Sequence, residues 1–395
     1  MNKNDLILVK DFLDAQNVSV LNTRAFKPKD HHFIITVGSV DQAASKKNVQ
    51  FKNATFDLQY GEFGNYLKEV NKNLAEAKKY AANEHQEKMI DLYIKHFQSG
   101  DINVHKDSQR EWVKDKGPSV ETNLGWVEKY VDPQNIRAMW SGWVAFNDKD
   151  RSKKFHQLVQ NSEKIVPKLP WERSLENSKF MAPDFSSLDI MTFAGDRLPS
   201  GINIPNYYDI REHDGFKNVI FENKAKASNK TDTVPMAHMK TLEETITFNK
   251  HQKDAYKVQV AGHELFGHGS GKLIYKDEKT GKCPQRVEDP INPGQFIESC
   301  YEKGETYSTK FGDISTSFEE CRADLSGLYL QQYPDMYSLF GWNNKNSTDL
   351  HWISMMQEFR KGILGLATSY NKERAKWNQA HTQGAFVISQ FIMQN

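Results

Sequence analysis

The chain has 395 residues, which is long enough for roughly two or three ordinary domains or one large two-lobed body. It carries 52 Lys and Arg against 51 Asp and Glu, and this formal net charge of +1 argues against recognition of nucleic acid or an anionic membrane through a global field. The hydrophobic content of 38% is typical of a globular protein rather than a disordered or fibrous one, and no uninterrupted apolar stretch is long enough to cross a bilayer.

The first part of the chain, to about residue 61, is expected to be rich in strands. The run FIITV around Ile35 fits a strand, and Phe56, Leu58 and Tyr60 alternate with polar neighbours at the period of two that half-buried strands show. This pattern predicts a sheet or barrel.

The period changes between about residues 63 and 97, where apolar residues recur at intervals of three and four and Ser99-Gly100 supplies a stop. That segment is predicted to be helical. Gly117-Pro118 then breaks the chain before an extended stretch, and the prolines and glycine of LPSGINIPNYYDI (198–210) exclude the interior of a helix.

Helices are predicted to dominate from Asp254 onward, with Asp254 as the candidate N-cap of segment 254–272. Thr316-Ser317-Phe318-Glu319 has the form of a capping box at the start of the next helix. Two further amphipathic helices are predicted at 350–367 and 373–391.

The three cysteines, Cys283, Cys300 and Cys321, are an odd and widely spaced set without a CxxC pair. Such a set argues against a disulfide framework and for a reducing compartment. The N-terminus also lacks the apolar run of a signal peptide. We therefore expect a cytoplasmic protein.

The segment HELFGH offers two histidines, His263 and His268, with Glu264 between them. A catalytic zinc site needs three protein ligands and an open position, and two histidines with one carboxylate are a recurrent set. The common motif spaces its histidines at i and i+4, whereas i and i+5 puts them about 140° apart on a regular helix. A π-type bulge would return both imidazoles to one face, and Gly267 makes that distortion easier. The alternative is a pair of ordinary histidines on a buried helix.

A second cluster, EECRAD, places two adjacent carboxylates and a third acid on the start of a helix. Glu320 can reach a metal, while Glu319 or Asp324 accepts an imidazole N–H and thereby fixes the tautomer of a histidine ligand. Taken alone, EECRAD could be a solvated helix start, since acids favour first turns. The two motifs together are much more specific than either one.

HELFGHGSGKL together with EECRAD resembles the dipeptidyl peptidase III family, whose hallmark is an HExxGH helix followed by an EECRA(E/D) helix. The segments KGPSVET, PDFSSLDIMTFAG, GINIPNYYDI, GFKNV and NQAHTQ resemble the same family in the same order. The resemblance covers essentially the whole chain, as an internal fragment of the longer family sequence.

The resemblance implies a site for one zinc ion, Zn2+, bound by His263, His268 and Glu320, with Glu264 as the general base that polarises the bound water. His381 matches a histidine that helps to stabilise the tetrahedral transition state. Without the resemblance, His381 would be interpreted as a satisfied histidine on a helix face.

The resemblance also implies a set of substrate contacts. Asn203 and Asn206 match residues that hold the free N-terminal amine and the backbone of the peptide, and Glu121 matches a carboxylate that contacts the amine. Without the resemblance, the asparagines would be turn residues and Glu121 a surface charge. Asn123 belongs to the same substrate region but stands where the family commonly has tyrosine, so a phenolic donor to the developing oxyanion is missing.

Three further departures from the family pattern concern the surroundings of these residues. Asp324 replaces a more usual glutamate and is one methylene shorter, Ala385 stands where arginine is expected, and Tyr208 occupies a position that is often aspartate. None of them removes a metal ligand.

The fold class that the resemblance implies is an α+β, two-lobed peptidase with a mainly helical, zinc-bearing upper lobe and a mixed lower lobe on a partial β-barrel. Residues 1–141 and 187–232, the latter with GINIPN, would belong to the lower lobe. Residues 142–186 and 233–395 would belong to the upper lobe, truncated at the C-terminus.

The implied function is that of a zinc-dependent exopeptidase that releases dipeptides from the free N-terminus of short peptides, with no nucleic-acid or membrane partner. Three alternatives remain open: a truncated member that binds zinc or peptide without turnover, a zinc endopeptidase, and a helical protein with an incidental histidine pair.

Overall fold

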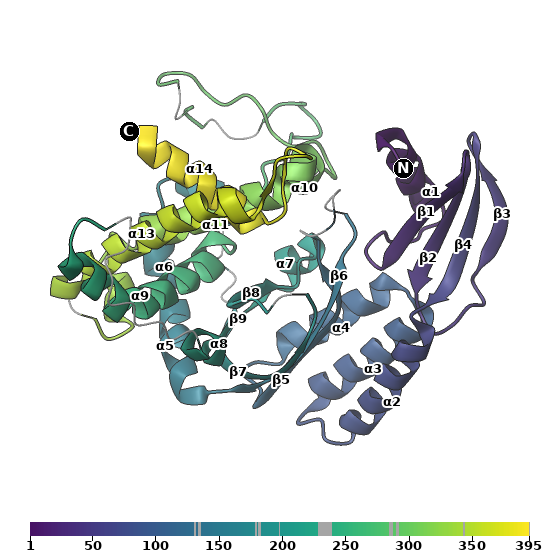
Figure 1. The fold of residues 1–395 in the computed structure, drawn as a ribbon, viewed down its shortest axis with the longest axis horizontal. Helices are drawn as coiled ribbons and strands as arrows, with labels where there is room; N and C mark the ends of the chain where they lie inside the picture. The colour runs from purple at the N-terminus through teal and green to yellow at the C-terminus, as the bar shows by residue number, and fades with distance from the viewer. Residues whose placement is uncertain are drawn as a thin grey trace. The chain divides into compact units, whose positions relative to one another are not determined.

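A computed structural model describes residues 1–129, 132, 136–177, 180, 183–196, 198–227, 239–283, 287–289, 292–342 and 344–394. The chain divides into two compact units (Figure 1). Unit 1 comprises Met1–Asn147, Ile190–Leu198 and Ile204–Lys217, and unit 2 comprises Asp148–Asp189, Pro199–Asn203 and Asn218–Asn395. The lobe boundaries inferred from the resemblance at 141/142 and 186/187 stay a prediction, and the one at 232/233 lies outside the described residues.

Unit 1 begins with a helix, α1 (Lys3–Ala15), which packs with a four-stranded sheet of order β1-β2-β4-β3. The strands are β1 (Thr23–Lys29), β2 (His32–Gly38), β3 (Lys46–Phe51) and β4 (Ala54–Glu62). Phe12 of α1 stacks on Phe56 of β4 with 4.1 Å between ring centroids. The strands expected here are confirmed, but the sequence-based prediction missed α1, which a capping box between Asn2 and Asp5 starts.

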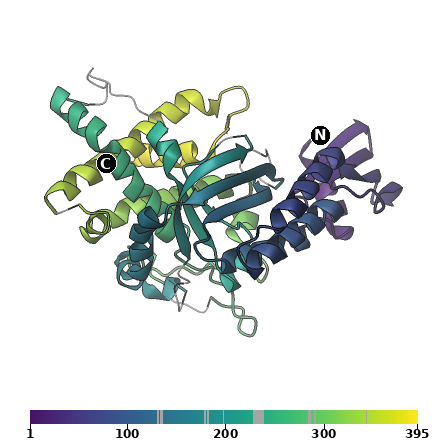
Figure 2. The same ribbon diagram turned by 90° about the horizontal axis from the view of Figure 1, so that it is seen from below.

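Three helices follow the sheet: α2 (Gly64–Lys78), α3 (Glu84–Ser99) and α4 (Ile102–Lys114). They are neighbours in the two views of Figures 1 and 2. The single helix predicted near residues 63–97 is therefore two, because the chain turns before Asn83, whose side chain caps α3. Gly100 ends α3 at a φ of 79°, which confirms the predicted stop.

A five-stranded sheet of order β5-β6-β7-β9-β8 comes next along the chain. Its strands are β5 (Val120–Glu128), β6 (Met139–Asn147), β7 (Asp184–Ala194), β8 (Gly201–Ile204) and β9 (Lys217–Phe221), and two short helices, α7 (Tyr208–His213) and α8 (Glu222–Ala227), flank β9 in the sequence. The division between the two units falls within β7, β8 and β9. The open order of this sheet fits the partial barrel expected from the resemblance.

Unit 2 is mainly helical around one hydrophobic cluster. Its remaining helices are α5 (Lys149–Gln160), α6 (Ser162–Ile165), α9 (Leu242–Gly262), α10 (Tyr307–Phe311), α11 (Ser315–Leu330), α12 (Asp335–Ser338), α13 (Asn344–Thr368) and α14 (Ala380–Gln394). A hairpin of β10 (Tyr370–Asn371) and β11 (Lys376–Trp377) separates the last two helices. Because α11 packs against α9, α13 and α14, side chains from all four helices can meet.

Two predicted helix caps in unit 2 are not found where they were expected, and the helix predicted at 373–391 begins only at Ala380. Helix α9 begins at a capping box of Thr241 and Glu244, so Asp254 lies inside the helix and is not its N-cap. Helix α11 begins at Ser315 without a side-chain cap, and the capping box predicted at Thr316–Glu319 is absent. Glu319 is instead used for a contact described below.

The expectation about cysteines was wrong for one pair, because Cys283 and Cys300 form a disulfide. Between α9 and α10, isolated β-bridges pair Tyr275 with Tyr301 and Glu288 with Phe296. The Cα atoms of Cys283 and Cys300 lie 5.9 Å apart, within the range that a disulfide spans. Sequence spacing alone cannot show such a pairing. The cysteine count therefore no longer supports a reducing compartment.

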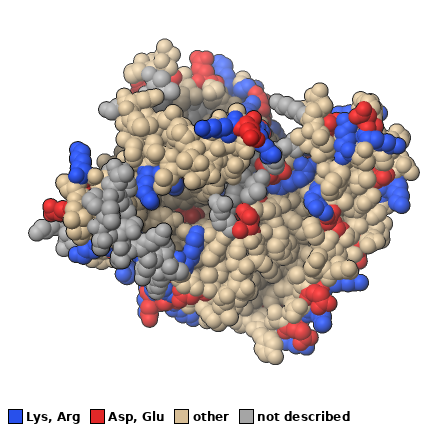
Figure 3. Space-filling view, viewed as in Figure 1, with Lys and Arg blue, Asp and Glu red and all other residues tan. Residues whose placement is uncertain are grey.

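The predicted α+β class is confirmed by the two sheets and the mainly helical unit 2. Over the described residues, none of the helices combines the length and the apolar character needed to span a bilayer. Acidic and basic side chains are interspersed on the face shown in Figure 3, as expected for a net charge of +1.

Candidate metal centre

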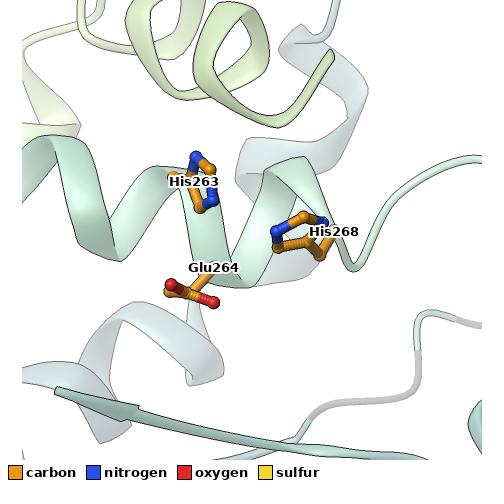
Figure 4. Close-up of side chains that lie close together, drawn as sticks. All are labelled: His263, Glu264 and His268. Carbon is orange, nitrogen blue, oxygen red and sulfur yellow. The ribbon is translucent and has the colours of Figure 1, made fainter. Parts of the chain in front are cut away.

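The centre is built on a π turn, His263–Gly267, that continues α9. The N–H of His268 donates to the carbonyl of His263 at 3.0 Å, a bond over five residues instead of four. The π-type distortion predicted from the histidine spacing is thus confirmed. The two imidazole rings lie 4.7 Å apart between centroids, and Figure 4 shows them with Glu264 on this turn.

Small residues allow α11 to approach the π turn at backbone contact. A Cβ on Gly267 would lie 2.6 Å from the Cα of Ala323, and one on Gly327 would lie 3.0 Å from the backbone nitrogen of His263. The sequence-based interpretation gave Gly267 the role of easing the helix distortion. In the structure it also leaves room for α11, and this close approach puts the acids of EECRAD within reach of the histidines.

Two carboxylates of α11 fix the tautomers of the histidine pair. Nδ1 of His263 lies 2.8 Å from Oδ1 of Asp324, and Nδ1 of His268 lies 3.0 Å from Oε1 of Glu319. Because an ionised carboxylate only accepts, each Nδ1 donates its proton, and in the neutral imidazole this leaves Nε2 as the nitrogen that can bind a metal. The one-methylene deficit of Asp324 has not broken its contact.

Glu320 is the point on which the imidazoles converge. Its Oε2 lies 3.2 Å from Nε2 of His263, 3.5 Å from Nε2 of His268 and 3.1 Å from Nδ1 of His381. This buried oxygen accepts no hydrogen bond among the described residues. Ligand atoms about 2.0–2.1 Å from a tetrahedral zinc ion lie about 3.3 Å from one another, so the distances from Glu320 to the histidines and the donor types fit zinc.

The structure brings together two overlapping groups that could hold a metal: His263, Glu264 and His268, and His263, Glu320 and His381. Within each group the potential ligand atoms lie within 4.8 Å of one another. His381, from α14, is the most open of the three histidines around Glu320, with 37% of its side chain exposed. Its distance from Glu320 suits either a ligand or a group facing the substrate.

Glu264 lies on the π turn between the two histidines and is only 5% exposed. Burial raises the pKa of its carboxyl group above the ordinary value. A carboxylate whose pKa is raised in this way can both take and return a proton, as a general base must.

Three charged residues that the sequence-based analysis did not single out support the carboxylates. Arg322 donates two bonds to Glu319, at 2.9 and 2.6 Å. Burial opposes ionisation of Glu319, but Arg322 and His268 outweigh it and lower the pKa to about 2. The spacing of Arg322 three residues after Glu319 could have indicated this pair.

The other two residues are Lys361 and Glu358 of α13. Nζ of Lys361 lies 2.9 Å from Oδ2 of Asp324 and 2.7 Å from Oε2 of Glu358. A chain of contacts thus runs from His263 through Asp324 to Lys361 and Glu358. No sequence pattern links α13 to EECRAD, so this connection needed the structure.

The predicted substrate residues Glu121 and Asn123 lie in unit 1, on β5, and both are 2% exposed. The carboxylate of Glu121 accepts from Nε1 of Trp112 at 2.6 Å and from the buried ammonium of Lys217. Nδ2 of Asn123 donates to Oε1 of Gln109 at 2.8 Å. Each side chain is therefore engaged within unit 1.

The two predicted asparagines fall in different units. Asn203, in unit 2, is 8% exposed and donates to the carbonyl of Glu264 at 2.9 Å, whereas Asn206, in unit 1, donates to Glu128 at 3.1 Å. The structure thus joins Asn203 directly to the proposed general base.

Ala385, where arginine was expected, is fully buried in α14 against Gly362 of α13.

Comparison with known proteins gives a match over the whole chain: the model of Peptidase family M49 matches residues 1–395. Dipeptidyl peptidase 3 of Rattus norvegicus is 40% identical over 405 residues, which cover 99% of this chain and 54% of that protein. Dipeptidyl peptidase 3 of Dictyostelium discoideum is 38% identical over 397 residues, which cover 98% and 57%. The chain therefore spans little more than half the length of these relatives.

Two solved structures share the fold. DPP III from Caldithrix abyssi has a TM-score of 0.66 at 18% identity and is matched over 100% of this chain and 64% of its own. Dipeptidyl-peptidase III from Corallococcus sp. strain EGB has a TM-score of 0.67 at 19% identity, over 98% and 62%. The two structures agree with the α+β architecture described above.

Proposed function

Since this chain belongs to peptidase family M49, we propose that it hydrolyses peptides at a metal centre held by His263, His268 and Glu320. The observation that carries the proposal is the convergence of imidazole nitrogens on the buried Oε2 of Glu320, at 3.1–3.5 Å, beside the buried carboxylate of Glu264. Such a set of donors next to a carboxylate with a raised pKa suits metal-assisted hydrolysis.

We propose zinc as the metal, because two neutral imidazoles and one carboxylate are a typical donor set for catalytic zinc. When bound, zinc lowers the pKa of a water ligand and polarises the scissile carbonyl. Asp324 and Glu319 hold the two histidines in the tautomer that offers Nε2. Arg322 and Lys361 in turn hold these carboxylates in place.

Glu264 would accept a proton from the attacking water and deliver it to the leaving amine. Its burial raises its pKa, which makes the carboxylate a stronger base toward the attacking water. His381, close to Glu320 and partly exposed, would donate to the oxygen that becomes negative in the transition state. Each role uses an atom already near the centre of the site.

We further propose that the substrates are short peptides with a free N-terminus and that the products are dipeptides. The support is the likeness to proteins named dipeptidyl peptidase 3 and the presence of Asn203 beside Glu264. Glu121, Asn123 and Asn206 of unit 1 stay predicted contacts.

A second candidate is binding of zinc or peptide without turnover. It is favoured by the limited coverage of the relatives, by Asn123 in place of tyrosine, and by Glu121, whose carboxylate already has two partners. An endopeptidase of the same zinc type is a third.

A chromogenic dipeptidyl-naphthylamide separates these candidates. The purified chain should release the naphthylamine, and Glu264→Gln should lower kcat by roughly 10²-fold or more while zinc content stays at that of the wild type. Zinc binding by the unaltered chain without any release would favour the non-catalytic candidate. Cleavage of N-acetylated peptides at an undiminished rate would favour the endopeptidase.

A further inference from the structure

The π turn leaves one backbone carbonyl without its regular partner. In an α-helix, the carbonyl of Glu264 would accept from the N–H of His268, four residues later. In this chain that N–H donates to His263 instead, at 3.0 Å. The bond that brings the two histidines onto one face thus takes the donor away from Glu264.

Asn203 of β8 supplies a replacement donor. Its Nδ2 lies 2.9 Å from the carbonyl oxygen of Glu264, and the bond is buried. The same nitrogen also donates to Oδ1 of Asn218, so both amide hydrogens have acceptors and the side chain is held in orientation. An unmatched buried carbonyl destabilises a fold, so this bond favours the π turn over a regular helix.

Gly201 lies two residues before Asn203 on β8. It lies close to the side-chain carboxylate of Glu264, whereas Asn203 contacts the backbone carbonyl. A Cβ on Gly201 would lie 2.9 Å from Oε1 of Glu264 and 3.2 Å from the carbonyl of Val219. The strand therefore contacts the backbone of Glu264 through Asn203 and its carboxylate through Gly201. Both contacts lie within unit 2.

We propose that Asn203 is a positioning residue for the metal centre: its amide replaces the donor that the π turn removes from Glu264 and so stabilises the register that presents both histidines. The role is separate from any contact with the peptide, since it uses the Nδ2 donor of Asn203 toward the backbone of Glu264. It deepens the proposed function, because it concerns the same site.

The test compares Asn203→Ser with Asn206→Ser in the full chain. Serine at position 203 is too short to reach the Glu264 carbonyl. Asn206→Ser is the matched control, because it shortens an asparagine of the same segment whose native side chain bonds to Glu128 and not to the π turn. In the metal-free chain, Asn203→Ser should speed amide exchange over residues 264–269, whereas Asn206→Ser should leave it unchanged. In zinc competition against a chelator, Asn203→Ser should weaken affinity roughly tenfold and alter the absorption spectrum of the cobalt-substituted chain.

Unchanged exchange, zinc affinity and cobalt spectrum, with only KM raised, would overturn the proposal and leave Asn203 as a peptide contact. Should the serine variant fail to fold, Asn203→Leu decides, because leucine has nearly the shape of asparagine, carries no charge and has no donor. Loss of folding in both variants would also overturn the proposal, since Asn203 would then serve the fold of unit 2 as a whole. A wild-type chain without peptidase activity would refute the proposed function alone, because amide exchange needs neither metal nor turnover.

Discussion

Asp324 joins the metal centre to the interior of the helical unit. One of its oxygens accepts from His263 at 2.8 Å, and the other contacts Lys361 at 2.9 Å. Lys361 also contacts Glu358, so one cation serves two carboxylates whose side chains are 6% and 5% exposed. Burial raises the pKa of Glu358 to about 7, and Asp324 adds to this rise.

Lys361→Met should therefore destabilise the chain. Removing the ammonium leaves two buried carboxylates close together without a cation. Breaking a fully buried ion pair costs about 3–5 kcal/mol, and because 34% of the Lys361 side chain is exposed to screening water we expect roughly 1–3 kcal/mol. Urea denaturation followed by circular dichroism measures the change in the free energy of unfolding. Lys376→Met is the control, because that side chain is 56% exposed and its pairing with Asp313 is on the surface. Equal stability of the two variants would contradict the role given to Lys361.

At the scale of elements, the site depends on how closely α11 approaches the π turn. Gly262, Gly267 and Gly327 all lie where a Cβ would meet backbone atoms of the other helix, at 3.1, 2.6 and 3.0 Å. Glu320 and Asp324 reach the histidines because the two backbones are this near. The metal centre is thus a consequence of glycine placement as well as of ligand chemistry.

Gly267→Ala is expected to push α11 away from the π turn. The new methyl group would lie 2.6 Å from the Cα of Ala323, which no side-chain rotation can relieve, so overpacking should cost roughly 1–3 kcal/mol. Zinc affinity should fall as well, since Glu320 moves with α11. Chelator competition and urea denaturation give the two quantities, with Leu325→Ala on the 48% exposed face of α11 as the control. Zinc affinity equal to that of the wild type would show that the ligands tolerate a wider separation.

Local patterns predicted the parts of the site that are continuous in sequence. The histidine spacing predicted the π turn, and EECRAD indicated Glu320 and its neighbours because few residue types bind zinc. Contacts between distant segments could not be predicted in this way. Lys361 follows Asp324 by 37 residues and Asn203 precedes Glu264 by 61, each on an element whose own pattern points to no metal. The disulfide of Cys283 and Cys300 was missed for the same reason.

At the scale of the whole molecule, unit 1 contains a pair of buried histidines that are not part of the proposed metal centre in unit 2. His96 and His105 are fully buried in unit 1, with 4.9 Å between ring centroids. Burial lowers the pKa of His96 to about 3 and that of His105 to about 4, from an ordinary value of 6.5. Both imidazoles are therefore neutral in the folded chain at pH values where the unfolded chain binds protons.

Acid should destabilise unit 1 through these two histidines. Because their folded pKa values are lowered, the stability they contribute is complete above pH 6.5 and is lost as the pH falls toward about 4 and about 3. The loss is roughly 3 kcal/mol per imidazole at pH 4. Urea denaturation between pH 7 and pH 4 should show this slope, with His96→Gln flattening it and the exposed His31→Asn leaving it unchanged. A slope that neither His96→Gln nor the double variant with His105→Gln alters would assign the acid sensitivity to other groups.

Metal removal should act on unit 2, because all the proposed ligands and the residues that hold them belong to it. A ligand present at 100 times its dissociation constant stabilises the folded state by about 2.7 kcal/mol, so a chelator should speed exchange through unfolding of unit 2 roughly 100-fold. Hydrogen exchange read by mass spectrometry should show this acceleration in α9, α11 and α14, while peptides from β2, β4 and α3 keep their rates. Acceleration in both units alike would mean that the two unfold together, and no acceleration anywhere would remove the metal centre on which the proposed function rests.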